Sequence, residues 1–365
     1  MRNVSAILGM VFILLAPYSV FAGSDVLFVV PRVATFWQVY VDFAKAAGKD
    51  LGLEIEVIWG NDDRYFMKQA VESRLESDSP PEVIMFNNFQ GMGSKFIKMT
   101  QKYEVKALLV NSQLSDEHRE ELGVPRDLYP NWIGDIVPAD RDTARKASKL
   151  LIDEAFRKHA YVSIIGLSGP LKNGSSMQRE AGLYDVLASN PYATLNQLVN
   201  IPKMSRLDSK RRFTGLIKRY SKSNVVWSSN SQIHNGAFEA ALEMGIKPGQ
   251  QLVFGVLDID DHILKKITTG EIVCATGGHY TEGAWAAVLL YDYLNGRDFA
   301  EESTRFTSPM AVVTQSNAEL FSNKFHINNL GSDSIDKIDF SIYSKVKNPS
   351  LDKYNFSMDD LLDKF

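Results

Sequence analysis

Residues 26–59 read VLFVVPRVATFWQVYVDFAKAAGKDLGLEIEVIW. The stretch opens with five apolar residues, Val26–Val30, continues with a segment of helical period from about Phe36 to Leu51, and closes with a second largely apolar run, Glu54–Trp59. A continuous apolar run of this length predicts a strand buried on both faces, and an amphipathic helix between two such strands makes them parallel neighbours in one sheet. This β–α–β unit decides the fold class.

The same unit recurs along the chain in two series. Between residues 123 and 142 the pattern lapses into a stretch that contains Pro, Trp and Asp, and the second series starts after it. Right-handed crossovers place helices on both faces of each sheet. We therefore expect an α/β fold of two doubly wound parallel-sheet lobes, divided near residue 135. Further strands are expected at 83–86, 107–110, 161–167, 195–201, 225–228, 252–257 and 272–276, and further helices at 65–76, 93–101, 115–122, 142–157, 176–188, 207–220, 233–244, 261–268 and 282–294.

The composition is that of a globular protein with a slight negative charge. The 365 residues include 40 Lys or Arg and 44 Asp or Glu, which gives a net charge of −4. This balance leaves no surplus positive charge for phosphates, so nucleic acid is not expected as a partner. The single cysteine, Cys274, cannot form an intramolecular disulfide or a Cys-rich metal cluster, and its apolar neighbours predict a buried structural thiol.

The first 22 residues have the pattern of a secretory signal peptide. Arg2 precedes an apolar run from Ile7 to Ala16, and small residues stand at the −3 and −1 positions before an expected cut at Gly23. The apolar run is too short to span a bilayer, which argues against the alternative of an uncleaved anchor. No cysteine follows the cut, which argues against a lipid anchor. We expect a soluble protein exported to the bacterial periplasm, where a long chain without disulfides is common.

Parallel strands gather their functional loops at their carboxyl ends, so ligand-binding residues are expected there. Phe36 and Trp37 follow the first strand; one is expected in the core and the other free to stack on a flat ligand face. Arg179 lies in a first helical turn, where the helix dipole disfavours a cation, so its guanidinium is expected to bind oxygen atoms. The full set of expected ligand-binding residues is Phe36, Trp37, Asn88, Asp140, Arg179, Asn230, Asp258 and His279.

Some of these residues have a structural alternative. Asn88 follows a strand, where an amide either bonds ligand hydroxyls or caps a helix and stabilises a turn. Asp140 or Asp142 is expected as the N-cap of the next helix, which leaves the other carboxylate for ligand or hinge. A glycine pair precedes His279 and permits an unusual backbone path, which places this histidine at the mouth of the site.

Two further strand ends combine candidate ligand residues with candidate caps. Asn230 is expected to face the ligand, with Ser231 as a competing cap. Asp258 is expected to point into the site, while Asp260 or Asp261 caps the next helix. A metal site is the alternative for this acidic run, but it lacks the turn glycine and the distal glutamate of a calcium loop.

Motifs that would support catalysis or cofactor binding are not found. Gly169 to Gly174 has the spacing of a phosphate loop, but Ser175 stands where lysine is required. The sequence contains no G-x-S-x-G, H-E-x-x-H or G-x-G-x-x-G. We expect no catalytic residue, no metal and no cofactor, and therefore a protein that is not an enzyme.

The strand-end motifs, taken in order, resemble those of the type I periplasmic binding proteins of the ribose and galactose class. Residues 179–183, REAGL, resemble that family's Arg-x-x-Gly-Phe helix start. Asn230-Ser231 with Gly236-Ala237 is similar to its Asn-Asp and Gly-Ala pair, and residues 255–258, GVLD, resemble its Gly-Phe-Asp strand end. Phe36-Trp37 falls where the family stacks aromatic rings on sugar. The likeness covers about residues 25–314.

The resemblance implies three chain crossings that form a hinge, at about 137–140, 277–278 and 306–310. It implies an N-terminal lobe of residues 23–138 with 280–306 and a C-terminal lobe of residues 139–279 with 307–365. It also implies capture of a small polar, sugar-like ligand by closure of the lobes, and delivery to the membrane permease of an ABC importer. The alternative is a ligand sensor that docks on a membrane histidine kinase, cyclase or chemoreceptor, with the carboxy-terminal segment 348–365 as a candidate partner surface.

Three positions depart from the family pattern. Ser231 replaces an aspartate, Met177 replaces an arginine and Asn111 replaces an acid. Each change removes a charge that would pair with sugar hydroxyls. Together with His279, they favour a ligand other than an ordinary free pentose or hexose.

Overall fold

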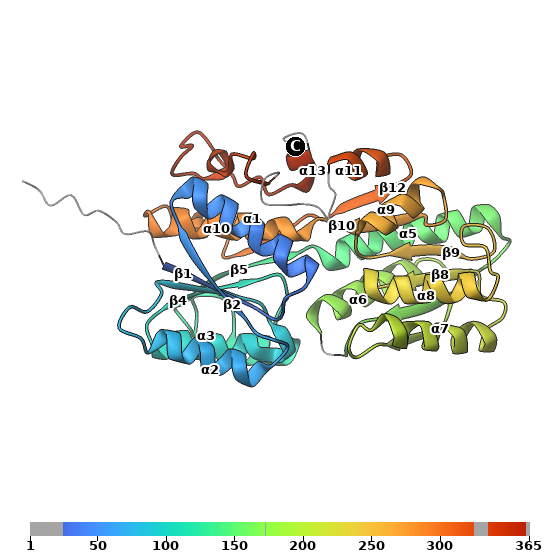
Figure 1. The fold of residues 1–365 in the computed structure, drawn as a ribbon, viewed down its shortest axis with the longest axis horizontal. Coiled ribbons are helices and arrows are strands. Elements are labelled where there is room, and N and C mark those ends of the chain that lie inside the picture. Colours follow the sequence, from blue (N-terminus) through green and yellow to red (C-terminus); the bar gives the residue numbers. More distant parts are fainter. Residues whose placement is uncertain (1–24, 172, 325–334, 363–365) are drawn as a thin grey trace, which may run out of the picture.

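The computed structural model describes residues 25–171, 173–324 and 335–362, so the expected signal peptide lies outside the described residues. Two six-stranded sheets lie side by side along the long axis of the molecule, each with helices on both faces (Figure 1). Alternate residues of the inner strands enter separate apolar clusters on the two faces. Among the described helices we find none with the length and apolar character needed to cross a membrane.

The first sheet has the strand order β11-β5-β4-β3-β1-β2, and every pair in it is parallel. Helices α1 and α10 pack against one face, while α2 and α3 cover the other. The strands are β1 (Asp25–Val30), β2 (Glu54–Trp59), β3 (Val83–Phe86), β4 (Lys106–Val110), β5 (Trp132–Pro138) and β11 (Arg305–Ser308); the helices are α1 (Thr35–Leu51), α2 (Arg64–Leu75), α3 (Met92–Lys102), α4 (Asp116–Leu122) and α10 (Glu282–Leu294), with short 3-10 turns at η1 (Phe89–Gly91) and η3 (Phe299–Glu301).

The second sheet has the order β12-β10-β9-β8-β6-β7 and is parallel except for the edge pair β10–β12. Helices α5 and α6 cover one face, and α8 and α9 pack against the other beside α7. The strands are β6 (Val162–Ser168), β7 (Ala193–Asn200), β8 (Val225–Ser228), β9 (Val253–Val256), β10 (Cys274–Gly277) and β12 (Ala311–Thr314); the helices are α5 (Asp140–Lys158), α6 (Gly174–Ala188), α7 (Arg206–Arg219), α8 (Ser231–Glu243), α9 (Asp261–Thr268) and α11 (Ala318–Lys324), and η2 (His279–Thr281) precedes α10.

The predicted fold class is confirmed. The chain passes between the two sheets three times, from β5 into α5, from β10 into α10 and from β11 into β12. The expected burial of Cys274 is also found, and burial raises the pKa of its thiol to about 12. This thiol is therefore protonated and unreactive at neutral pH.

Three strands were missed from the sequence, and the most central is β5. The strand pattern lapses over residues 123–142, where Gly134, Asp135 and Pro138 are all residue types that are unfavourable in strands. The structure stabilises the buried Asp135 with hydrogen bonds from Arg119 at 3.0 Å and from the Trp132 indole at 2.8 Å. β5 is thus a buried strand whose polar residue is neutralised by a partner from α4. The other missed strands are β11 and β12.

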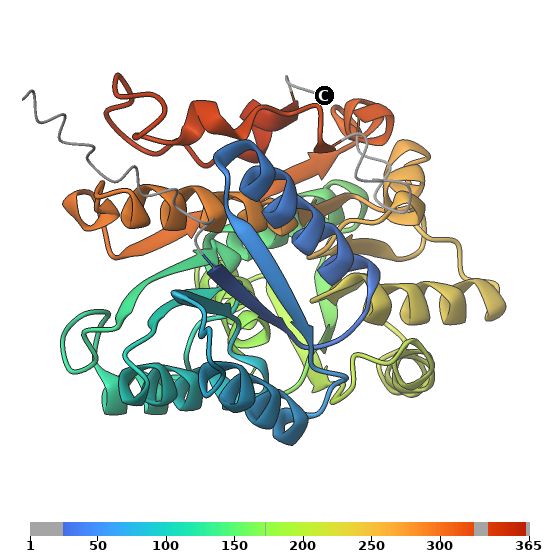
Figure 2. The same cartoon turned by 60° about the vertical axis from the view of Figure 1, so that its left-hand side comes forward.

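The carboxy-terminal segment lies against the first lobe. The family resemblance implies that residues 307–365 belong to the second lobe, and in the structure residues 335–362 pack over α1 and α10 of the first lobe (Figure 1 and Figure 2). Phe356 stacks on Trp285 of α10 with ring centroids 5.2 Å apart. Within this segment η5 (Phe340–Tyr343) contacts α1, and α13 (Met358–Leu362) returns to the second crossing, where Met358 lies against Gly278.

Asp292 fixes this segment to α10. Its fully buried carboxylate accepts hydrogen bonds from the backbone of Lys345 at 2.7 Å, from Val346 at 3.2 Å and from the Tyr354 hydroxyl at 2.8 Å. The Ser344 hydroxyl donates to it as well. One acid of α10 therefore satisfies four donors of the segment.

Replacing Asp292 by Ala is expected to lower the free energy of unfolding by about 3 kcal/mol, because several buried donors lose their acceptor. Urea unfolding measures this change, and limited proteolysis should cut the released segment first. Asp352→Ala is the matched control, since Asp352 is exposed in the same segment. Equal stability of both variants would contradict the anchoring role of Asp292.

Candidate ligand-binding site

Arg179 is the centre of the candidate site. Its side chain is buried, and its Nε donates to Asp140 Oδ1 at 2.7 Å. Its Nη1 donates to the carbonyl oxygens of Ser229 and Leu257, both at 2.7 Å. These bonds use three of the five N–H groups, so the Nη2 group keeps its donors for another partner. Arg179 therefore joins the start of α5 to the carboxyl ends of β8 and β9.

Asp140 and Asp258 are the two carboxylates beside this arginine. Burial raises the pKa of Asp140 above its ordinary value, and the attraction of Arg179 opposes that rise. Burial likewise raises the pKa of Asp258, again against the effect of Arg179. Asp258 Oδ2 accepts from the Ser231 hydroxyl at 2.8 Å, and its Oδ1 accepts from the Ile259 amide at 3.0 Å. The guanidinium of Arg179 thus lies beside two acids, of which Asp258 also accepts from Ser231 and Ile259.

The helix caps differ in part from the sequence expectation. Asn230, not Ser231, is the N-cap of α8, and its Oδ1 accepts from the Ile233 amide at 2.9 Å. Its amide nitrogen is left to donate elsewhere. Ala139 stands at the N-cap of α5, where Asp140 or Asp142 was expected.

The cap of α9 is the one expected from the sequence. Asp260 accepts from the Ile263 amide at 2.8 Å. The acidic run therefore caps a helix, and no group of His, Cys, Asp or Glu suited to a metal ion occurs in the part of the chain that the structure describes.

The two aromatic residues after β1 divide their roles. Trp37 is buried in the core, whereas Phe36 is only partly buried. The Phe36 ring lies 4.7 Å from the His279 ring, centroid to centroid. Burial lowers the pKa of His279 well below its ordinary value, and the charge of Arg179 adds to this effect. At neutral pH the imidazole is therefore uncharged, and its buried Nδ1 has no partner among the described residues.

Asn88 uses its amide inside the first lobe. Its Oδ1 accepts from the Gly93 amide at 3.0 Å, and its Nδ2 donates to the Gln113 carbonyl at 2.8 Å. These are the bonds of the structural alternative. The neighbouring Asn87 has a buried Nδ2 without a partner in the described part of the chain, so the free amide donor expected at Asn88 is found at Asn87.

A set of buried polar side chains lies at the carboxyl ends of strands in both lobes. Each has an atom that is shielded from solvent and has no hydrogen-bond partner among the described residues. Buried polar atoms are nearly always paired in folded proteins, so a set gathered at strand ends indicates a polar ligand. The set comprises Asn87, Asn111, Ser112, Ser168, Ser228, Ser229, Thr276 and His279. Only His279 was expected from the sequence, because Ser, Thr and Asn at strand ends also occur in ordinary turns.

The two lobes touch at Gly174, the first residue of α6. A methyl group there would lie 2.8 Å from the Gln113 carbonyl oxygen and 3.4 Å from Ser112 Oγ, both in the first lobe. A side chain at this position would therefore force the lobes apart. Only glycine permits this approach, and the sequence alone marks Gly174 only by its phosphate-loop spacing from Gly169.

Glu282, which no sequence motif marks, lies at the second crossing. Its fully buried carboxyl accepts from the Ser308 hydroxyl of β11 and from the Tyr40 hydroxyl of α1 at 3.4 Å. Burial raises its pKa well above the ordinary value of 4.5, and the nearby charge of Asp140 raises it further. This acid at the second crossing thus contacts β11, which leads into the third crossing, and lies near Asp140 at the first.

Comparison with known proteins places this arrangement in a known fold. No protein-family model and no curated protein matches the chain. A solved periplasmic sugar-binding protein from Pseudomonas fluorescens is 28% identical, with a TM-score of 0.81, over 93% of this chain and 99% of that one. A galactofuranose-binding protein is 16% identical, with a TM-score of 0.70, over 82% and 97%. The arabinose-transporter binding protein of Shewanella sp. ANA-3 is 20% identical, with a TM-score of 0.69, over 82% and 94%.

These similarities confirm the resemblance seen in the sequence: the chain has the fold of the type I periplasmic binding proteins. In such a fold the carboxyl strand ends of two lobes face one another. In this chain the contacts of Arg179 and the unpaired polar set lie at the carboxyl ends of strands.

Replacing Glu282 by Gln is expected to make stability less dependent on pH. The unfolded carboxyl loses its proton near pH 4.5, while the folded one keeps it to higher pH. Between these two values the wild type loses up to about 1.4 kcal/mol of stability per pH unit as pH rises, and the Gln variant does not. Urea unfolding between about pH 5 and pH 8 measures the difference. Glu319→Gln, at an exposed glutamate of α11, is the control, and parallel pH profiles for wild type and Glu282→Gln would contradict the assignment.

Proposed function

We propose that this protein is a periplasmic solute-binding protein, which captures a small, uncharged, hydroxyl-rich ligand of the sugar class between its lobes. It releases the ligand unchanged to the membrane permease of an ABC importer. The observation that carries the proposal is the set of buried, unpaired hydroxyl, amide and imidazole groups at strand ends of both lobes. Such groups complement ligand hydroxyls, which both donate and accept hydrogen bonds.

The charges of the site favour a neutral ligand. The Arg179 guanidinium already has Asp140 at 2.7 Å and Asp258 nearby, so it offers directional N–H donors without a net positive charge. His279 is uncharged at neutral pH. A phosphate or sulfate would therefore lose its hydration without gaining a counter-charge. A sugar carries no charge and needs no counter-charge.

The expected ligand residues enter the proposal as follows. Phe36 offers its partly buried ring to an apolar sugar face beside His279. Arg179, Asn230 and Asp258 supply the hydrogen-bonding groups that their own contacts leave over. Asp140 orients Arg179, while Trp37 and Asn88 support the first lobe from inside.

The structural neighbours agree with this substrate class and location. The Pseudomonas fluorescens protein is described as periplasmic and sugar-binding, and the Shewanella protein as an ABC transporter component bound to arabinofuranose. The expected leader at residues 1–22 would deliver this chain to the same compartment. In the described residues we find no feature that favours the membrane-sensor alternative.

A thermal-shift panel of sugars tests this function. At least one neutral sugar or polyol is expected to raise the melting temperature, because a ligand present at about 100 times its Kd adds about 2.7 kcal/mol to the free energy of unfolding. Sugar phosphates and sugar acids are the matched charged compounds and should not do so through this site. If a broad panel of neutral sugars, furanose forms and inositols never moves the melting temperature, the proposal fails.

Replacing Gly174 by Leu tests the role of lobe closure. The side chain would meet the Gln113 backbone, so the lobes cannot close and the affinity for the sugar is expected to fall by roughly tenfold or more. Isothermal titration calorimetry measures the affinity. Gly215→Leu is the control, because nothing lies within 4 Å of a methyl group at that helical position. Unchanged affinity in the Gly174 variant would show that binding does not require this contact.

A further inference from the structure

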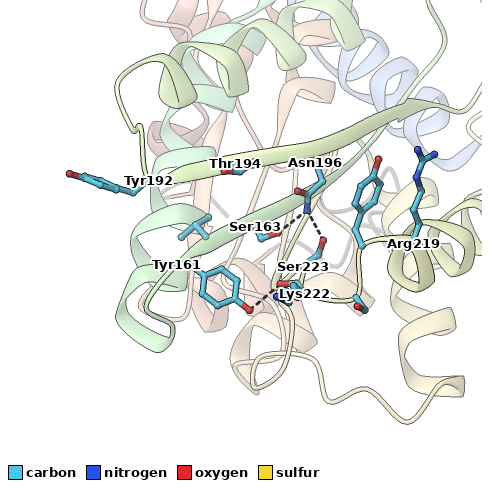
Figure 3. Close-up of a pocket in the computed structure, with 11 residues that line it drawn as sticks. Tyr161, Ser163, Tyr192, Thr194, Asn196, Arg219, Lys222 and Ser223 are labelled. Carbon is cyan, nitrogen blue, oxygen red and sulfur yellow. Dashed lines mark hydrogen bonds between the residues drawn. The ribbon is translucent and has the colours of Figure 1, made fainter.

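The second lobe has a hollow at the end opposite its candidate ligand residues. It lies at the amino ends of β6, β7 and β8, whereas the Arg179 contacts lie at carboxyl ends. Its volume is about 480 Å³, within the range of roughly 300–1,000 Å³ typical of small-molecule sites. Figure 3 shows Asn196, Ser163 and Ser223 gathered in its middle, with Tyr161 and Arg219 on opposite sides.

The floor of the hollow presents hydroxyl hydrogens. Asn196 Nδ2 donates to Ser163 Oγ at 2.7 Å and to Ser223 Oγ at 2.9 Å (Figure 3). Each serine oxygen is thus an acceptor in this bond, so its own O–H must donate to something else. Neither hydroxyl has an acceptor within the described part of the chain, although both serines are more than nine-tenths buried. The floor therefore offers two hydroxyl donors to an acceptor in the hollow.

The wall of the hollow is basic. No Asp or Glu lines it, although the whole chain is acidic. Residues 203–222 hold eight Lys or Arg and a single Asp, and four of these cations form ion pairs with acids of α7 and α8. The structure shows no carboxylate partner for Lys218, Arg219 or Lys222 among the residues it describes.

Charge alone would not indicate a ligand here. Arg219 ends α7, and a cation at a helix carboxyl terminus also offsets the helix dipole. The two serine hydroxyls of the floor are an observation independent of the helix dipole. A hydroxyl donor is not attracted to a cation such as Arg219, so the dipole does not explain why both lie beside the same hollow. Donors beneath and cations beside one open volume are the groups that bind the oxygens of an anion. Tyr161 adds an aromatic wall for the body of the molecule that carries it.

We propose that this hollow is a second binding site, distinct from the site between the lobes, which binds a phosphate group through the Ser163 and Ser223 hydroxyls and the cations Arg219 and Lys222. The phosphate belongs either to a small soluble molecule or to the headgroup of an anionic lipid. Its binding needs no sugar and no lobe closure, so it stands or falls independently of the proposed transport function.

The probes are inorganic phosphate and glycerol 1-phosphate in calorimetric titrations of the full-length protein, with chloride at equal ionic strength as reference. Vesicles of phosphatidylglycerol, compared with phosphatidylcholine vesicles in co-sedimentation, form the lipid arm. Arg219→Ala/Lys222→Ala is the test variant, and it is expected to fold because both residues are exposed. Arg211→Ala/Arg212→Ala removes the same number of positive charges from α7, outside the hollow, and is the matched control.

The wild type and the control variant are expected to bind a soluble phosphate compound or phosphatidylglycerol vesicles, and the test variant to bind roughly tenfold more weakly or not at all. Binding of the soluble compounds identifies a small-molecule site, and binding of vesicles alone identifies a lipid site. The proposal is overturned if the wild type binds neither probe. It is also overturned if both double variants lose binding equally, or if the test variant keeps wild-type affinity.

Discussion

The guanidinium of Arg179 is the contact on which the arrangement of the candidate ligand site depends. It pairs with Asp140, at the point where the chain enters α5 from the first lobe, and it donates to the last carbonyls beyond β8 and β9. Those carbonyls would otherwise be buried without partners, since neither strand continues past them. One side chain therefore fixes the hinge relative to two strand ends. Its remaining N–H groups are held in position as a result.

The hinge itself is polar and buried, which is costly unless each group finds a partner. Asp140 has Arg179, and Glu282 has the hydroxyls of Ser308 and Tyr40. Burial raises the pKa of Glu282 well above its ordinary value, so a second negative charge beside Asp140 is disfavoured. A neutral hinge beside a charge-balanced arginine suits a neutral ligand, and the unpaired strand-end hydroxyls and amides supply the hydrogen bonds that such a ligand needs.

The sequence predicted what depends on local pattern. Apolar runs and helical period predict β1, α1 and β2. Arg179 was identified because the helix dipole disfavours a cation in a first helical turn, so its guanidinium was expected to bind oxygen atoms. The sequence did not reveal what depends on contacts between distant segments. β5 is a strand because Arg119 neutralises Asp135 and because β11, some 170 residues later, pairs with it. Gly174 and Glu282 acquire their roles only when segments far apart in the chain meet, and the segment at 335–362 returns to the first lobe through aromatic contacts that no local pattern encodes.

The hollow on the second lobe likewise depends on contacts between distant segments, which the sequence does not reveal. The basic run of α7 is visible in the sequence, but the bonds from Asn196 that leave two serine hydroxyls without an acceptor arise only in the folded sheet.

The most direct test of the proposed ligand site between the lobes is a crystal structure with a neutral sugar selected by thermal shift. We predict that the sugar oxygens lie within hydrogen-bond distance of Arg179 Nη2 and of unpaired groups from both lobes, such as Asn87 and Thr276. A sugar bound elsewhere, or held by one lobe alone, would contradict the account.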